Sequence, residues 1–275
     1  MKKYIVFLLL FIFCASPIYA DTGNCPLSGD DPPCGVISLA EVIGFINQWA
    51  TGNASLSDVI GLITAWSAPQ ESLSDKPVVE LFVMSHCPYG LQIEKGLIPV
   101  LDSLNDSVNF SVKFCGYAMH GRIEIDEQLT QYCIQREQMD RYLPYLRCFL
   151  ADGNTSGCLN RTGIDFVDLA ECTQASDTKY NITRNYYNQT TWFAGRYPPF
   201  SIYKEETEQY NIYSSPTLLM NGSIVETNRD SKSLLATICA GFGAKPASCD
   251  ANLSDAMPAL GFGFIDSGNN QSGSC

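Results

Sequence analysis

One short run of this sequence contains residue types that can react through sulfur. Cys87 lies in the run Ser85-His86-Cys87-Pro88-Tyr89-Gly90, directly after one of the two histidines of the chain. The thiolate form of cysteine is the nucleophile and the metal ligand, whereas the protonated thiol is neither. The elements around Cys87 therefore decide whether it reacts or only packs.

The flanking segments predict a strand-to-helix junction at Cys87. Pro77–Met84 has the β-branched content and length of a strand, and apolar residues recur at helical spacing from Leu91 to Leu104. The positive end of the helix dipole and the free amides of the first turn lower the pKa of a thiol placed there. Pro88 suits the first turn because it has no amide hydrogen. This combination favours a reactive cysteine over a buried structural one.

The rest of the domain predicts an α/β fold. Residues 108–115 form a second strand, which should run parallel to the first because a helix joins them. The C-terminal ends of the two strands, and with them Cys87 and Cys115, then lie at one edge of the sheet. A mostly helical insertion over 123–192 follows, and then a proline-led strand (214–220), a hairpin turn at Asn221-Gly222, a return strand (223–226) and a helix (231–239).

These motifs resemble the thioredoxin superfamily. Cys87-Pro88-Tyr89-Gly90 is similar to its Cys-Pro-Tyr-Cys active site with the second cysteine missing, and Ser215-Pro216 is similar to its cis-proline loop. The resemblance implies a thioredoxin-like fold with a helical insertion, preceded here by a small helical hairpin. It implies that Cys87 is the nucleophile, that Pro216 lies opposite it, and that Ser215, Pro88 and Tyr89 contact substrate.

A closer resemblance, over residues 78–249, is to the gamma-interferon-inducible lysosomal thiol reductase family, with DsbA-like proteins as more distant relatives. It rests on the insertion cysteines, on Ser215–Gly222, on Leu234–Cys239 and on Lys245–Cys249. The chain departs from that family at Gly90 and in lacking its Cys-Gln-His-Gly segment. The resemblance implies a thiol-disulfide oxidoreductase or isomerase that acts on protein or peptide disulfides and needs no cofactor.

Gly90 leaves the motif without a resolving cysteine, so an outside thiol, a second substrate thiol or another cysteine of this chain must release the substrate. Cys115 is one candidate, and the alternative is that it is a small buried core residue. Two other classes of function stay open. One is a non-catalytic thioredoxin-fold binding module, and the other is a metal-binding protein that uses Cys87, Cys115, His86 and His120, with Met84 and Met119 nearby.

The remaining cysteines indicate a disulfide framework. Of twelve cysteines, Cys14 falls in the N-terminal apolar segment and eleven remain, an odd number. We expect Cys25 to pair with Cys34 and Cys239 with Cys249. The insertion cysteines should pair among themselves, with three connectivities open, and they are Cys133, Cys148, Cys158 and Cys172.

The N-terminus predicts export. Residues 1–20 have the basic start, apolar run and small final residue of a cleaved signal peptide, and no later stretch is apolar enough to span a membrane. A net charge of −12 argues against nucleic acid as a partner. Glycosylation sequons begin at Asn53, Asn105, Asn109, Asn154, Asn160, Asn181, Asn188, Asn221, Asn252 and Asn270. We expect a secreted or cell-surface glycoprotein.

The predicted organisation has five parts. After the signal peptide, residues 25–68 hold two helical segments that repeat at an offset of 17 residues and resemble a dockerin with a degenerate calcium loop. This hairpin is a candidate site for a protein partner. A linker (69–76), the thioredoxin-like domain (77–249) and a low-complexity tail (250–275), expected to be disordered, complete the chain.

Overall fold

The structure is a computed structural model, and it describes residues 28–29, 39–67 and 76–264. The chain divides into two compact units, residues 1–70 and 71–275. The expected signal peptide, the calcium-like loop with Cys25 and Cys34, and Cys275 lie outside the described residues. Within the described residues, no helix has the length and apolar character that a membrane span requires.

The first unit is the expected helical hairpin, made of α1 (Leu39–Ala50) and α2 (Leu56–Ser67). Val42 and Phe45 of α1 pack against Val59 and Leu62 of α2. Ser55 precedes α2 and its hydroxyl accepts a hydrogen bond from the amide of Asp58, at 3.2 Å. The side-chain oxygen therefore satisfies one of the first free amides of the helix.

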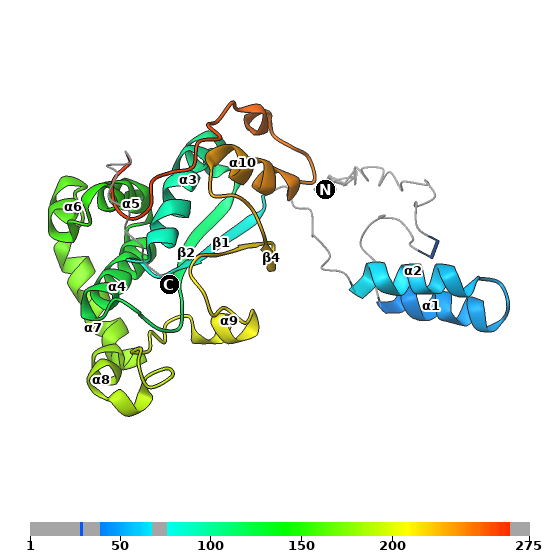
Figure 1. Cartoon of the computed structure of the whole chain (residues 1–275), viewed down its shortest axis with the longest axis horizontal. Coiled ribbons are helices and arrows are strands. Elements are labelled where there is room, and N and C mark those ends of the chain that lie inside the picture. The colour runs from blue at the N-terminus through cyan, green and yellow to red at the C-terminus, as the bar shows by residue number, and fades with distance from the viewer. Residues whose placement is uncertain (1–27, 30–38, 68–75, 265–275) are drawn as a thin grey trace, which may run out of the picture. The chain divides into compact units, whose positions relative to one another are not determined.

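The second unit is built on a four-stranded sheet in the order β2-β1-β3-β4 (Figure 1). The strands are β1 (Val78–Val83), β2 (Asn109–Phe114), β3 (Thr217–Met220) and β4 (Ser223–Val225). β1 pairs parallel with β2, so that Val83 lies opposite Phe114, and antiparallel with β3. The parallel pair brings the C-terminal ends of β1 and β2 to one edge, as the sequence predicts.

Alternate residues of β1 point to opposite faces of the sheet, as strand geometry requires. Leu81 and Val83 belong to the larger hydrophobic core, while Phe82 and Met84 belong to a second cluster that includes Cys87 and Cys115. Both faces are buried, which explains why β1 is a continuous apolar run.

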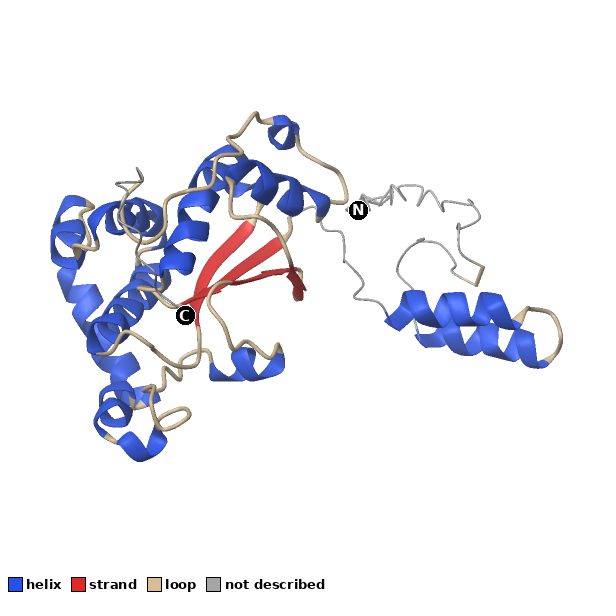
Figure 2. Cartoon of the chain, viewed as in Figure 1, coloured by secondary structure: helices blue, strands red, loops and turns tan. Residues whose placement is uncertain are grey.

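Helices surround the sheet (Figure 2). α3 (Pro88–Leu104) joins β1 to β2 and packs against α10 (Ser231–Ala240). The helical insertion lies between β2 and β3 and contains α4 (Arg122–Glu137), α5 (Met139–Asp152), α6 (Thr155–Arg161), α7 (Phe166–Tyr180) and α8 (Ile182–Tyr187). α9 (Lys204–Gln209) and three short 3-10 turns (Asn105–Ser107, Gln189–Thr191 and Ala247–Asp250) complete the unit. This is a thioredoxin-like fold with a helical insertion.

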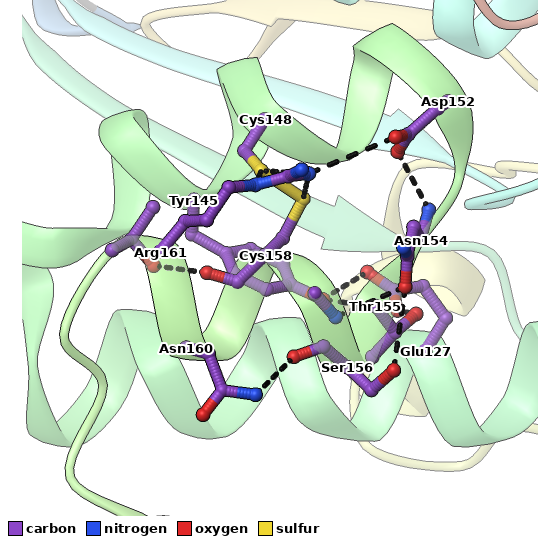
Figure 3. Close-up of a disulfide and its surroundings, with 12 residues drawn as sticks. Glu127, Tyr145, Cys148, Asp152, Asn154, Thr155, Ser156, Cys158, Asn160 and Arg161 are labelled. Atoms are coloured by element: carbon purple, nitrogen blue, oxygen red, sulfur yellow. Dashed lines mark hydrogen bonds and ion pairs between the residues drawn. A yellow bond between two sulfur atoms is a disulfide. The ribbon is translucent and has the colours of Figure 1, made fainter.

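Disulfides join neighbouring helices of the insertion. Cys133 of α4 is bonded to Cys172 of α7, and Cys148 of α5 to Cys158 of α6. Figure 3 shows the second bond, with the Arg161 guanidinium donating to both of its sulfur atoms. Cys239 is bonded to Cys249, which ties α10 to the turn after it. The structure thus selects one of the three connectivities that the sequence left open.

The same close-up shows how the insertion holds a buried carboxylate (Figure 3). Glu127 of α4 accepts hydrogen bonds from the hydroxyls of Tyr145 and Thr155. Burial raises the pKa of Glu127, while the bonds from Thr155, Gln131 and Tyr145 act in the opposite direction. These hydrogen bonds connect α4 to α5, which contains Tyr145, and to α6, which contains Thr155.

The expectation of disorder from residue 250 onward is wrong for residues 251–264. Ala251, Leu253 and Phe262 pack against the main core. The buried ammonium of Lys95, in α3, donates to the carbonyl oxygens of Ala259, Gly261 and Gly263 at 2.5, 2.8 and 2.6 Å. A buried ammonium needs acceptors on every side, and this segment supplies them.

Candidate active site

Cys87 occupies the N-cap position of α3. Its amide donates to the Met84 carbonyl at 2.9 Å, and its carbonyl accepts the Leu91 amide at 2.9 Å, which begins the helix. Pro88 is the first helical residue. The amides of the first turn have no acceptor within the helix, so they and the helix dipole favour a negative charge on the sulfur.

Cys87 is fully buried and is disulfide-bonded. The other described cysteines form the three bonds given above, except for Cys115, which is a free thiol. The partner of Cys87 therefore lies outside the described residues.

A cis-proline loop lies against the Cys87 sulfur. The Ser215–Pro216 peptide bond is cis. The Sγ atom of Cys87 is 3.5 Å from the Ser215 carbonyl oxygen, and the Ser215 hydroxyl accepts a hydrogen bond from the Met84 amide at 2.9 Å. Residues more than 120 positions apart in the sequence thus meet at the junction of β1 and α3.

Gly90 fits closely beneath this loop. A Cβ atom at position 90 would lie 3.0 Å from the Ser215 Oγ, 3.2 Å from the Met84 carbonyl oxygen and 3.4 Å from the Val83 Cβ. A second cysteine at this position would therefore require the Ser215 side chain to shift. The close packing gives a physical reason for glycine at position 90, where the sequence resemblance implies a second cysteine.

Tyr89 is half-buried, and its ring lies 5.1 Å from the Arg229 guanidinium. A guanidinium at this distance is attracted by the face of the ring. Pro88 is buried, and its carbonyl accepts the Gly261 amide at 3.3 Å. The C-terminal segment therefore touches α3 directly after Cys87.

Cys115 lies at the end of β2, and its amide donates to the Val83 carbonyl at 3.0 Å. Its thiol is 3.5 Å from the Ser214 carbonyl oxygen, so both Cys87 and Cys115 face the cis-proline loop. Burial raises the pKa of the Cys115 thiol to about 12, and the charge of Glu124 acts in the same direction. Cys115 is thus protonated at neutral pH, which disfavours it as a nucleophile.

Glu124 is a site residue that sequence reasoning missed. Its buried carboxylate accepts the amides of His86 (3.1 Å), Met119 (2.7 Å) and His120 (3.0 Å) and contacts the His120 Nδ1 at 2.9 Å. Burial by itself would raise the Glu124 pKa, but the bonds from His120 and His86 outweigh it and the pKa falls below its ordinary value. The sequence pattern that could have indicated Glu124 is an acidic residue three positions after Gly121, the residue that precedes α4. An acidic side chain at this position of a helix can accept hydrogen bonds from the free amides before it.

The two histidines have different surroundings. Burial lowers the pKa of His86, whose ring packs edge-on against Phe149 and Phe262 at 5.7 Å. The hydrogen bond with Glu124 raises the pKa of His120. Among the described residues, no group of three or more His, Cys, Asp or Glu side chains is placed to hold a metal ion.

Two cavities are lined by residues in or just before the cis-proline loop. One, of about 230 Å³, is lined by Ser214, Pro216, Thr217 and Arg229 among others. The second, of about 450 Å³, is lined by Ile212 and Tyr213 and by the aromatic rings of Tyr117 and Phe193, which stack on each other at 4.6 Å. Residues of the cis-proline loop thus line the first cavity, and Tyr213, two residues before Ser215, lines the second.

Comparisons with known proteins give matches among solved structures. The chain is similar to DsbA from Mycobacterium tuberculosis, at 15% identity over 63% of this chain and 86% of that one, with a TM-score of 0.43. It is also similar to BdbD from Bacillus subtilis, at 14% identity over 60% and 89% and a TM-score of 0.41. No protein-family model and no curated protein matches.

Proposed function

We propose that this protein is an extracytoplasmic thiol-disulfide oxidoreductase or isomerase that acts on protein disulfides through Cys87. One observation carries the proposal: the Cys87 sulfur lies at the N-terminus of α3 and 3.5 Å from the carbonyl oxygen of Ser215, whose bond to Pro216 is cis. A sulfur in this place combines a stabilised thiolate with a neighbouring extended backbone that can pair with a peptide.

In the reaction, the reduced Cys87 thiolate attacks one sulfur of a substrate disulfide. The substrate S–S bond breaks, a Cys87–substrate mixed disulfide forms, and the second substrate sulfur leaves as a thiolate that takes a proton from solvent. The aromatic cavity beside Tyr213 offers apolar contact for the residues that flank the substrate cysteine. Protein or peptide substrates suit a site of this kind.

Export is part of the proposal. It rests on the signal-like residues 1–20 and on the three disulfides among the described residues, because such bonds persist in oxidising compartments. The proposed relationship to the gamma-interferon-inducible reductases and the dockerin-like nature of residues 25–68, with a protein partner for the hairpin, rest on the sequence resemblance.

The test is turnover of a protein disulfide. We expect the pre-reduced protein to reduce insulin in the presence of glutathione, and Cys87→Ser to lower the rate by more than about 1,000-fold, because serine cannot exchange sulfur. Cys115→Ser is the control for removal of a buried thiol, and an unchanged rate in that variant would also show that Cys115 does not release the substrate. Equal rates for the wild type and Cys87→Ser would instead support a non-catalytic binding module.

A further inference from the structure

Arg229 is a partly buried cation that forms no ion pair with any described residue. The other described lysines and arginines that are at least partly buried have partners, because Lys113 and Arg122 form ion pairs and Lys95 donates to three carbonyl oxygens. Of the five N–H groups of a guanidinium, one donates from Arg229 to the Gln92 Oε1 at 3.2 Å, and the others have no acceptor in the described part of the chain. Such a guanidinium has donors to spare for an anion.

The surrounding chain fixes the position of this guanidinium. It lies 5.1 Å from the centre of the Tyr89 ring. The Gln92 Nε2 donates to the Pro258 carbonyl at 2.7 Å, which leaves the Gln92 oxygen to accept from Arg229. The main chain of Arg229 packs on α3 at Gly96, where an added Cβ would collide with the Arg229 carbonyl oxygen. The cation is therefore held in place before any ligand arrives, which lowers the entropy cost of binding.

The polar cavity of about 230 Å³ extends from Arg229 to the cis-proline loop. Ser214, Pro216 and Thr217 line it on the side of the loop. Ser215, between the first two of these in the chain, is the residue whose carbonyl oxygen lies 3.5 Å from the Cys87 sulfur. A molecule that occupies this cavity thus lies beside the residue that contacts the sulfur.

We propose that this cavity binds a carboxylate of the molecule that exchanges disulfides with Cys87, and that Arg229 recognises this carboxylate. The inference rests on the proposed function of Cys87. The planar fork of a guanidinium matches the two oxygens of a carboxylate. The hydroxyls of Ser214 and Thr217, which also line the cavity, are further possible donors.

A carboxylate of this kind has two possible sources. One is an acidic side chain close to the cysteine of a peptide substrate. The other is a small thiol with carboxylates, such as glutathione, that releases the substrate from Cys87 or restores its thiol. Both present the same group to Arg229, so only kinetic comparison separates them.

Glu226 lines the same cavity and opposes the binding of an anion. Its side chain is exposed, and it forms no ion pair with Arg229. The net charge of −12 also repels anions, although salt screens charges beyond about 8 Å. Recognition must therefore come from the short-range contact with Arg229. Removing the charge of Glu226 should strengthen recognition, whereas removing that of Arg229 should abolish it.

The first measurement is the rate at which the pre-reduced, full-length protein forms a mixed disulfide with peptide disulfides. Each peptide carries Glu at one position near its cysteine, and a matched peptide carries Gln there. We expect wild type to react about tenfold faster with the Glu peptide at the best position, and Arg229→Gln to bring this ratio close to one. Glu226→Gln should raise the ratio, and Arg184→Gln, which removes an exposed arginine of α8, should leave it unchanged.

The ratio separates recognition from a structural effect of the substitution. Distortion around Tyr89 or Gln92 slows the reaction with both peptides and leaves their ratio as it was. Arg229→Lys keeps the charge without the planar fork, so we expect it to retain part of the preference for Glu.

The second measurement is the rate at which glutathione or its diethyl ester releases a peptide from Cys87. A ratio of these rates that falls in Arg229→Gln identifies the small thiol as the source of the carboxylate, whereas a change confined to the peptides identifies the substrate. If Arg229→Gln alters neither ratio, this inference is wrong while the proposed function stands. If no peptide forms a mixed disulfide with Cys87 in wild type, the proposed function itself is wrong.

Discussion

At the scale of the residue, Glu124 connects the loop before Cys87 to α4. Its carboxylate accepts the His86 amide on one side and the Met119 and His120 amides on the other. We expect Glu124→Gln to lower the free energy of unfolding by about 2 kcal/mol, because a buried charged acceptor is replaced by a group that also carries donors. Urea unfolding measures this, and Glu137→Gln, which alters an exposed ion pair of the same helix, should change it by less than about 0.5 kcal/mol.

The pH dependence of the same pair follows from its shifted pKa values. The pKa of Glu124 in the folded protein is lower than its ordinary value of 4.5. The ionised carboxylate therefore contributes its full stabilisation of the fold above pH 4.5, and this contribution is lost as the pH falls through the pKa of the folded protein. The raised His120 pKa means that its contribution is complete below 6.5 and is lost as the pH rises through the folded pKa. His120→Gln should therefore destabilise the protein more at about pH 5.5 than at about pH 8.5. The difference should stay below about 1 kcal/mol because His120 is partly exposed.

Gly90 tests how tightly the cis-proline loop packs on α3. An alanine at an exposed helix position gains up to about 1 kcal/mol over glycine, but here its Cβ would lie 3.0 Å from the Ser215 Oγ. That hydroxyl is buried and accepts the Met84 amide, so it cannot turn away without losing a hydrogen bond. We expect Gly90→Ala to destabilise the protein by about 1–2 kcal/mol. In a double-mutant cycle with Ser215→Ala, additive effects on unfolding would contradict this explanation.

At the scale of the element, Lys95 fixes the C-terminal segment on α3. Burial lowers the Lys95 pKa to about 8, while the charge of Glu94 acts in the opposite direction. Lys95→Met keeps the length of the side chain and removes all three donors, so we expect a loss of about 2–3 kcal/mol and faster amide exchange over residues 251–264. Lys232→Met is the control, because Lys232 contacts Asp255 of the same segment through an exposed ion pair at 3.7 Å and should matter little. Unchanged exchange in Lys95→Met would refute the role of Lys95.

The elements that could be predicted from the sequence are those with a strong local pattern. β1, α3, β2 and the hairpin at Asn221-Gly222 each have apolar periodicity or turn residues, and the structure has them within a few residues of the predicted bounds. α9 was missed because Lys-Glu-Glu-Thr-Glu-Gln contains no apolar residue, and of these six only Thr207 is buried. The docking of residues 251–264 was missed because it depends on Lys95, more than 160 positions away.

In the candidate site, too, the sequence predicts the residues that stand in a local motif and misses those that depend on distant contacts. Cys87 and Pro216 stand in recognisable motifs, so the sequence indicated both. Glu124 and Lys95 act through contacts that only the folded chain creates. The sequence also could not choose among the connectivities of the insertion cysteines, because spacing along the chain does not determine which helices become neighbours.

At the scale of the whole molecule, the disulfides hold together a domain whose sheet has only four strands among the described residues. Cys133–Cys172 closes a sequence separation of 39 residues, whereas Cys148–Cys158 and Cys239–Cys249 each close one of 10. The chain-entropy description of a disulfide depends on loop length, and it gives about 4 kcal/mol for the first bond and about 3 kcal/mol for each of the others. The long bond also joins two residues that are almost wholly buried, Cys133 and Cys172.

Replacing both cysteines of one disulfide by serine should therefore lower the free energy of unfolding by an amount that differs among the three disulfides. Cys133→Ser with Cys172→Ser should lower the free energy of unfolding most, by about 1 kcal/mol more than either of the other double variants, because it frees the longest loop and leaves two hydroxyls in the core. The variants at Cys148 with Cys158 and at Cys239 with Cys249 should resemble each other, because their loops are equal in length. Urea unfolding of the four proteins under non-reducing conditions gives the comparison. If the loss at Cys148 with Cys158 exceeds that at Cys133 with Cys172, contacts such as those of Arg161 with the sulfurs contribute more than loop entropy does.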